Sequence, residues 1–169
     1  PPSKIAPRIA DKLREINGET GGRLVCSITA IKDGIIKSMS ISCPAPGSAP
    51  GLRYLHPLAE LPIERLSVTG HSSDLTPLRK LHLQALELNF EGMPTKISLE
   101  PLRGMPIQEL AITSMLYPDL SPLKGMPLKF LKLAGTVESE SIEVLRGLPL
   151  QRLSFGFKQH DLAILKGMP

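Results

Sequence analysis

The sequence predicts an α/β protein in which short strands and short helical turns alternate in a repeated unit and build one parallel sheet. The segment 120–133 recurs with altered surface residues at 99–112 and at 142–155. The first apolar residues of successive copies lie 20 to 24 residues apart, at Leu55, Leu75, Leu99, Leu120, Ile142 and Leu162. Inside each copy the apolar residues follow the order Leu-x-x-Leu-x-Leu, which at this period is typical of stacked repeats that share one core.

The chain begins with a predicted amphipathic helix over residues 4–16. Its apolar residues recur every three or four positions, at Ile5, Ile9, Leu13 and Ile16. Ser3 is the expected N-cap, and Asn17-Gly18 is expected to end the helix.

A β-hairpin is predicted over residues 23–42. Leu24, Cys26 and Ile28 alternate along its first strand, and Asp33-Gly34 favours a tight turn. Ile36, Met39 and Ile41 repeat the apolar spacing of the later copies, so the second strand should begin the repeated sheet. We therefore predict an N-terminal cap over residues 1–51, which ends in a Pro/Gly loop, and repeats over 52–169, of which the last is incomplete.

The return path of each repeat is predicted to start with a cap and a proline. Ser121 should cap the turn that contains Pro122, and Thr76-Pro77 uses the same device. Glycines should end the turns, at Gly104, Gly125, Gly147 and Gly167. The copy at 75–98 deviates, because His82 stands where a proline is expected.

The predicted strands lie near 36–42, 63–68, 83–88, 107–112, 128–133 and 150–155, and only the strand at 24–31 should be antiparallel. The central leucines of the repeats should form a single buried stack of Leu66, Leu86, Leu110, Leu131 and Leu153. The strand at 150–155 should leave unpaired backbone groups on its far edge, so we expect either further chain or self-association there.

From Leu52 to Pro169 the chain resembles the leucine-rich-repeat family in its short bacterial form, Leu-x-Pro-Leu-basic-Gly-Met-Pro-Leu-x-x-Leu-x-Leu. It is similar to repeats in planctomycete-like multidomain proteins, which are often linked to a serine/threonine kinase domain. The resemblance implies a solenoid with a parallel sheet on its concave face, short helical or 3₁₀ turns on its convex side, and a helix-plus-hairpin cap. One departure is that the family's asparagine ladder is replaced by His71, Glu91, Met115, Thr136 and Lys158, so irregular turns are expected there.

Composition excludes several classes of protein. Hydrophobic residues make up 41% and aromatic residues only 4%, so the core should consist of stacked aliphatic side chains. A net charge of +4 is too small to indicate nucleic-acid binding by itself, and no apolar run is long enough for a membrane span. Because the chain starts at Pro1 without a signal pattern, we expect a piece of a longer protein; the compartment stays open, with the cytoplasm slightly favoured.

The candidate binding surface is the concave face, where residues between the strand leucines should point outward. Phe130 is the only aromatic residue among these positions, and aromatic and Arg side chains often anchor interfaces. An alternative is that the charges there simply pair across strands and keep the sheet soluble. The predicted binding residues are Arg65, Ser67, Glu87, Asn89, Glu109, Thr113, Phe130, Lys132 and Arg152.

Catalysis is not expected. Glu87 and Glu109 should lie on neighbouring strands, and two close carboxylates serve glycosidases, but no cleft or further catalytic group accompanies them. The sequence shows no phosphate loop and no nucleophile elbow, and we expect no cofactor. The histidines have no metal-ligand spacing and lie at unrelated repeat positions, His56, His71, His82 and His160.

A second candidate surface is a row of cations at one repeat position. A polyanion such as an acidic polysaccharide or nucleic acid could lie along it. Alternatively, each cation offsets the dipole of its own helical turn and needs no partner. The row consists of Arg79, Arg103, Lys124, Arg146 and Lys166.

The two cysteines, Cys26 and Cys43, should be same-face diagonal neighbours in the hairpin. We favour reduced, mostly buried thiols over a disulfide.

Two functions remain in competition. The first is a non-catalytic protein-recognition scaffold, a sensing or interaction segment of a larger bacterial protein that binds another protein. The alternative is a structural or adhesive module at the cell surface that binds glycans or other polyanions.

Overall fold

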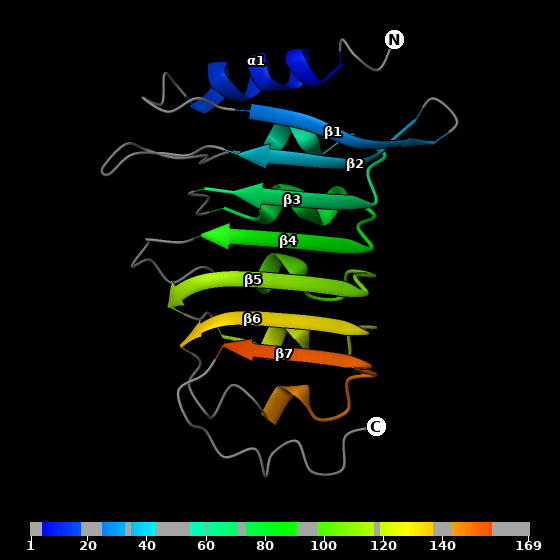
Figure 1. Cartoon of the computed structure of the whole chain (residues 1–169), viewed down its shortest axis with the longest axis vertical. Helices are drawn as coiled ribbons and strands as arrows, with labels where there is room; N and C mark the ends of the chain where they lie inside the picture. Colours follow the sequence, from blue (N-terminus) through cyan, green and yellow to red (C-terminus); the bar gives the residue numbers. More distant parts are fainter. Residues whose placement is uncertain are drawn as a thin grey trace.

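The structure, a computed structural model, describes residues 5–17, 25–32, 35–42, 55–59, 61–70, 74–90, 98–116, 119–136 and 143–156. It is an α/β fold in which one seven-stranded sheet is backed by short 3₁₀ turns and, at the N-terminal end, by a helix (Figure 1). The helix is α1 (Ile5–Asn17), and the strands are β1 (Val25–Lys32), β2 (Ile35–Ser42), β3 (Arg65–Thr69), β4 (Ala85–Phe90), β5 (Glu109–Leu116), β6 (Phe130–Thr136) and β7 (Arg152–Gly156). The turns are η2 (His56–Leu58), η3 (Thr76–Lys80), η4 (Glu100–Leu102) and η5 (Ser121–Leu123).

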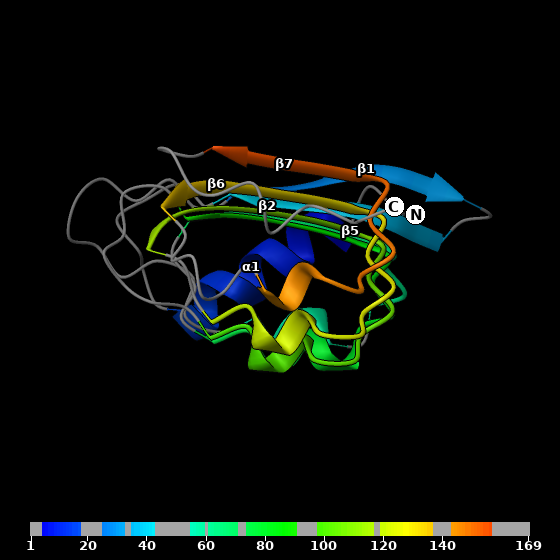
Figure 2. The ribbon, with the colours of Figure 1, turned by 90° about the horizontal axis from the view of Figure 1, so that it is seen from below.

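The strands follow one another across the sheet in chain order. β1 pairs with β2 antiparallel, and every later pair is parallel, which confirms the predicted mixture. Parallel neighbours need a crossover connection, and here each 3₁₀ turn lies on that return path behind the sheet (Figure 2).

Strands β3 to β7 start about two residues later than predicted. At the starts of β4 to β7, two successive backbone N–H groups donate to one carbonyl oxygen of the preceding segment. The backbone N–H groups of Gln84 and Ala85 both donate to the carbonyl oxygen of Glu64, at 2.7 and 3.1 Å. The same arrangement recurs from Gln108 and Glu109 onto Gln84, and at the starts of β6 and β7. Because one carbonyl oxygen accepts both N–H groups, the segment is already bonded to the preceding repeat before the regular parallel pairing of the strand begins.

The inward face of the sheet is built from residues in exact register. Met39, Leu66, Leu86, Leu110, Leu131 and Leu153 lie opposite one another from β2 to β7. Leu110 and Leu131 are completely buried, whereas Leu153 is only partly buried. The expected single buried stack is therefore wrong at β7, where the described residues place a neighbouring strand on one side only.

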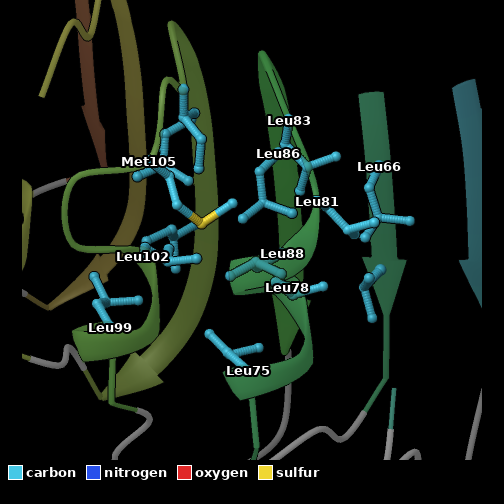
Figure 3. Packing of buried hydrophobic residues seen from close by; sticks show 14 of the residues in the cluster. Leu66, Leu75, Leu78, Leu81, Leu83, Leu86, Leu88, Leu99, Leu102 and Met105 are labelled. Carbon is cyan, nitrogen blue, oxygen red and sulfur yellow. The ribbon is translucent and has the colours of Figure 1, made fainter. Parts of the chain in front are cut away.

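The turns supply the other half of the core. Figure 3 shows Leu75 and Leu78 behind β4 in one layer with Leu86 and Leu88, beside the layer of Leu99, Leu102 and Met105. Each turn is closed by one backbone hydrogen bond between two of its leucines. In η3, for example, the N–H of Leu78 donates to the carbonyl oxygen of Leu75 at 2.9 Å. The repeated apolar positions thus bring sheet and turn together in every layer.

The predicted caps of the turns are wrong. Ser121 and Thr76 do not accept the capping bond; their own backbone N–H groups donate to the carboxylates of Asp119 and Asp74, each at 2.8 Å. Ser98 accepts from Glu100 in the same way at 3.3 Å. In each of these turns the capping oxygen belongs to the residue two positions before the donor. The leucine between the two residues is already buried in the core.

The predicted glycine ends of the turns are confirmed at three positions. Gly104, Gly125 and Gly147 have φ values of +73°, +75° and +86°, a left-handed conformation that side chains with a Cβ rarely adopt. Gly167, Ser3, Asp33-Gly34 and the residues replacing the asparagine ladder at 71, 91 and 158 lie outside the described residues.

At the N-terminal end, α1 lies on the same side of the sheet as the turns (Figure 2) and buries Ile9, Ala10 and Leu13. It is described from Ile5 to Asn17 and ends one residue later than predicted, while the predicted first residue, Lys4, lies outside the described residues. Cys26 pairs with Ile41 and is a free thiol that is partly rather than mostly buried. Burial raises the pKa of the Cys26 thiol to about 11, although the charge of Arg14 acts in the opposite direction. Cys43 lies outside the described residues, and within them no helix is long and apolar enough to cross a bilayer.

Candidate functional site

The candidate site lies on the open face of the sheet, which we define as the face away from the 3₁₀ turns (Figure 2). The predicted outward residues are aligned there in register. The first line is Arg65, Ala85, Glu109, Phe130 and Arg152, the second is Ser67, Glu87, Ala111, Lys132 and Ser154, and the third is Thr69, Asn89, Thr113, Ala134 and Gly156.

A hollow of about 390 Å³ crosses the strands on this face. Its floor exists because short side chains lie next to one another on consecutive strands, namely Ser38, Ser40, Ser67, Ala85 and Ala111. Longer side chains rise around them, from Thr29 on β1 to Lys132 on β6. The hollow therefore runs perpendicular to the strands rather than along one of them.

An ion pair bridges one side of the hollow. The guanidinium of Arg65 donates two hydrogen bonds to the carboxylate of Glu109, at 2.9 and 3.2 Å. The two residues are on β3 and β5, and the bridge passes over the small side chain of Ala85 on β4. The hydrogen bond with Glu109, and then its charge, raise the pKa of Arg65 above its ordinary value.

The two glutamates of the open face are held separately. Ser67 Oγ donates to the carboxylate of Glu87 at 3.1 Å, while Glu109 is engaged by Arg65. Both carboxylates are exposed, and in a glycosidase one of them would instead need an apolar environment that keeps it protonated. The geometry therefore gives the carboxylate pair no support as catalytic machinery.

The aromatic ring of Phe130 lies at the other side of the first hollow. The guanidinium carbon of Arg152 lies 5.9 Å from the ring centroid, within the range of a cation–π contact. A second hollow of about 430 Å³ begins here, lined by Gln108, Glu109, Lys129, Phe130, Gln151 and Arg152. Because Glu109 and Phe130 line both hollows, the two form neighbouring parts of one surface.

Several residues of the hollow were not among the sequence candidates. Ser38 and Ser40 contribute to the floor, and Thr29 bonds to Ser38 through their hydroxyl oxygens, 2.6 Å apart. The signal was present in the sequence, since Ser38, Ser40 and Ser42 alternate with the inward residues of β2. Conversely, Asn89 and Thr113 are in register with each other but line neither hollow.

The row of cations lies on the turn side and is partly neutralised there. Arg103 donates two hydrogen bonds to Glu100 on the same turn, at 2.7 and 2.8 Å, and Arg146 lies 3.5 Å from Glu143. The hydrogen bond from Arg103 lowers the pKa of Glu100. Arg79 and Lys124 are exposed, and Lys166 lies outside the described residues.

No metal site emerges in the described part of the chain, where no group of three His, Cys, Asp or Glu side chains could hold an ion. His56 is exposed on η2 and His82 is exposed between η3 and β4, while His71 and His160 lie outside the described residues.

Comparisons of this chain with protein-family models, with curated proteins and with solved structures found no match.

Proposed function

We propose that this chain is a leucine-rich-repeat solenoid, with a cap over 1–51 and repeats over 52–169, that acts as a non-catalytic protein-recognition scaffold. In this proposal the open face is the concave binding surface, and the chain is an interaction or sensing segment of a larger bacterial protein. Repeats of 20 to 24 residues whose strands lie in register support the fold assignment.

The observation that carries the functional proposal is the hollow across the strands. Short side chains on β2 to β5 leave room above the sheet, and a ring with an adjacent guanidinium stands at its end. Aromatic and Arg side chains are among the residues that most often carry binding energy at protein interfaces.

The alternative, a cell-surface module that binds glycans or other polyanions along the cation row, has weaker support. Two of the four described cations of that row already face a glutamate on their own turn. A polyanion would have to compete with these local pairs at each repeat.

Photo-crosslinking tests the location of the binding surface. A photoreactive amino acid is placed either at Lys132 on the open face or at Lys124 on the turn side, two exposed lysines whose replacement removes the same charge. In extracts of the source cells, we expect discrete crosslinked proteins from position 132 and few from position 124. Stronger crosslinking from position 124 would contradict the proposal and favour the cation row.

Paired alanine variants test the location of the binding surface by loss of crosslinking. Phe130→Ala with Arg152→Ala should abolish the crosslinks at position 132, whereas Lys124→Ala with Lys166→Ala should leave them unchanged at physiological salt. The reverse pattern, with a steep salt dependence, would favour a polyanion.

A further inference from the structure

The charges of the open face are distributed unevenly between its two halves. On β3 to β5 the acidic side chains have partners within the sheet, since Glu109 is bound by Arg65 and Glu87 by Ser67. On β6 and β7 the outward charged residues are cations only, because the segments 120–137 and 144–160 contain neither aspartate nor glutamate. Lys132 on β6 and Arg152 on β7 are exposed, and so is Lys129, which directly precedes β6 and lines the second hollow.

We propose that an extended acidic segment of a partner protein lies across the strands along the hollow of the open face, with its carboxylates on Lys129, Lys132 and Arg152 at the end over β5 to β7 and an apolar side chain packed on Phe130. This inference rests on the proposed function and specifies the chemistry of the partner. The charge complementarity is local, because Lys132 lines the first hollow with Phe130, while Lys129 and Arg152 line the second hollow with the same ring.

The dimensions suit an extended peptide. The first hollow runs from Thr29 on β1 to Lys132 on β6. At roughly 4.8 Å between neighbouring strands, this path is about 24 Å long. An extended chain covers about 3.4 Å per residue, so about seven residues would follow the hollow across the strands.

The turn side offers a contrast within the same molecule. Two of its four described cations, Arg103 and Arg146, are paired with Glu100 and Glu143 on the same turns, so an arriving carboxylate meets a neutralised site at these two positions. Arg152 on the open face instead lies over the Phe130 ring, a contact that leaves its charge unneutralised. The open face is therefore the better acceptor for an acidic ligand.

The test uses three fluorescein-labelled octapeptides with leucine and glycine at the same positions and with the other four positions all glutamate, all glutamine or all lysine. Fluorescence anisotropy with the whole chain at 50 mM NaCl should give the order glutamate, glutamine, lysine, from tightest to weakest. Raising the NaCl concentration to 300 mM should weaken binding of the glutamate peptide most, because exposed charges are then screened.

Two lysine variants provide the matched control. Lys132→Glu should weaken binding of the glutamate peptide about 3- to 10-fold, as expected when one exposed ion pair becomes a repulsion. Lys124→Glu changes the net charge equally but lies on the turn side, and should have little effect. An equal loss in both variants would overturn the inference, since it would show a non-specific charge effect.

A second pair of variants removes a negative charge, so that tighter binding of the glutamate peptide is expected rather than weaker binding. Glu109→Gln releases Arg65 on the open face, and Glu100→Gln releases Arg103 on the turn side. The first should tighten binding of the glutamate peptide about 2- to 3-fold, and the second should not change it measurably. Tightening by the Glu100 variant alone would overturn the proposed location.

Two further results would also reject the inference. One is a glutamate peptide that binds no better than the glutamine peptide. The other is a labelled oligouridylate that binds more tightly than the glutamate peptide, which would indicate a nucleic acid instead. Neither result decides the proposed function, because crosslinking from position 132 is measured independently.

Discussion

The two faces of the sheet are built from alternate residues of the same strands, yet they follow different rules. On the inward face, β3 to β6 repeat one residue type, with Leu66, Leu86, Leu110 and Leu131 in register and buried. On the open face, the line one residue earlier reads Arg65, Ala85, Glu109 and Phe130. Each inward leucine must fit the leucine above and below it, so every repeat is constrained alike.

The open face is free of that packing constraint, and its residues differ from strand to strand. The difference indicates which positions of this molecule can determine its binding specificity. Identical inward positions define the architecture, while the varied outward positions define what the surface can contact. Substitutions that violate this division should have effects that decrease from the buried layer to the surface.

The largest contrast is expected between neighbouring residues of β5. Leu110→Asp would place a charge in the buried layer without a partner and should destabilise the fold by several kcal/mol. Ala111→Asp, one residue later on the open face, should cost only about 1 kcal/mol. Urea denaturation of the two variants checks this, and equal midpoints would show that the register is wrong.

A smaller contrast should separate two leucines of the same inward line. Leu131 is completely buried, so Leu131→Ala should cost about 2–5 kcal/mol. Leu153 is only partly buried, and Leu153→Ala should cost less than half as much. Thermal and urea unfolding would measure both variants. A Leu153 variant that is as unstable as the Leu131 variant would indicate that β7 is covered more completely than its side-chain exposure shows.

The turns behind the sheet should show a pH-dependent contribution from Asp74. Asp74→Ala removes the acceptor for the Thr76 N–H and should cost about 0.5 kcal/mol at pH 7, the lower end for a capping residue because the site is solvated. The side-chain hydrogen bond with Thr76, followed by the bond from its backbone N–H, lowers the pKa of Asp74 below its ordinary value, so the native state favours the ionised carboxylate. Its contribution is complete above the ordinary pKa and is lost as the pH falls through the lower native value.

Unfolding of the parent chain and of Asp74→Ala should therefore converge at low pH. Asp74→Asn is the control, since it retains an acceptor oxygen but does not titrate. A difference between the parent and the alanine variant that stays constant down to the acid limit would contradict the assignment.

The smallest effect is expected from the ion pair of the open face. A double-mutant cycle with Arg65→Ala and Glu109→Ala should give a coupling of about 0.2–1 kcal/mol, because exposed pairs gain little. The pair should be salt-sensitive, and its loss should leave the m-value in urea unchanged. A coupling well above this range would mean that the bridge over Ala85 organises the sheet rather than its surface.

Much of the fold was predictable because the repeat carries its own register. Aligning the copies by their leucines placed Arg65, Ala85, Glu109, Phe130 and Arg152 on one line, and the structure has the same line. The errors were local. Ser121 looked like a cap because it precedes Pro122, but the backbone of the turn directs its N–H toward Asp119. The late starts of β4 to β7 coincide with carbonyl oxygens that accept two N–H groups, a feature that no residue type indicates.

The sequence by itself determined the architecture, because apolar residues at a fixed period can be buried only if successive copies stack in register. It also determined which side chains stand on the open face, since side chains alternate along a strand. Only the tertiary structure decided how those side chains meet. Arg65 forms its ion pair with Glu109 across β4, although the two residues are 44 positions apart in the chain. The guanidinium of Arg152 lies over the Phe130 ring. Such partners depend on side-chain reach between strands and on the small residue between them, which a repeat pattern does not encode.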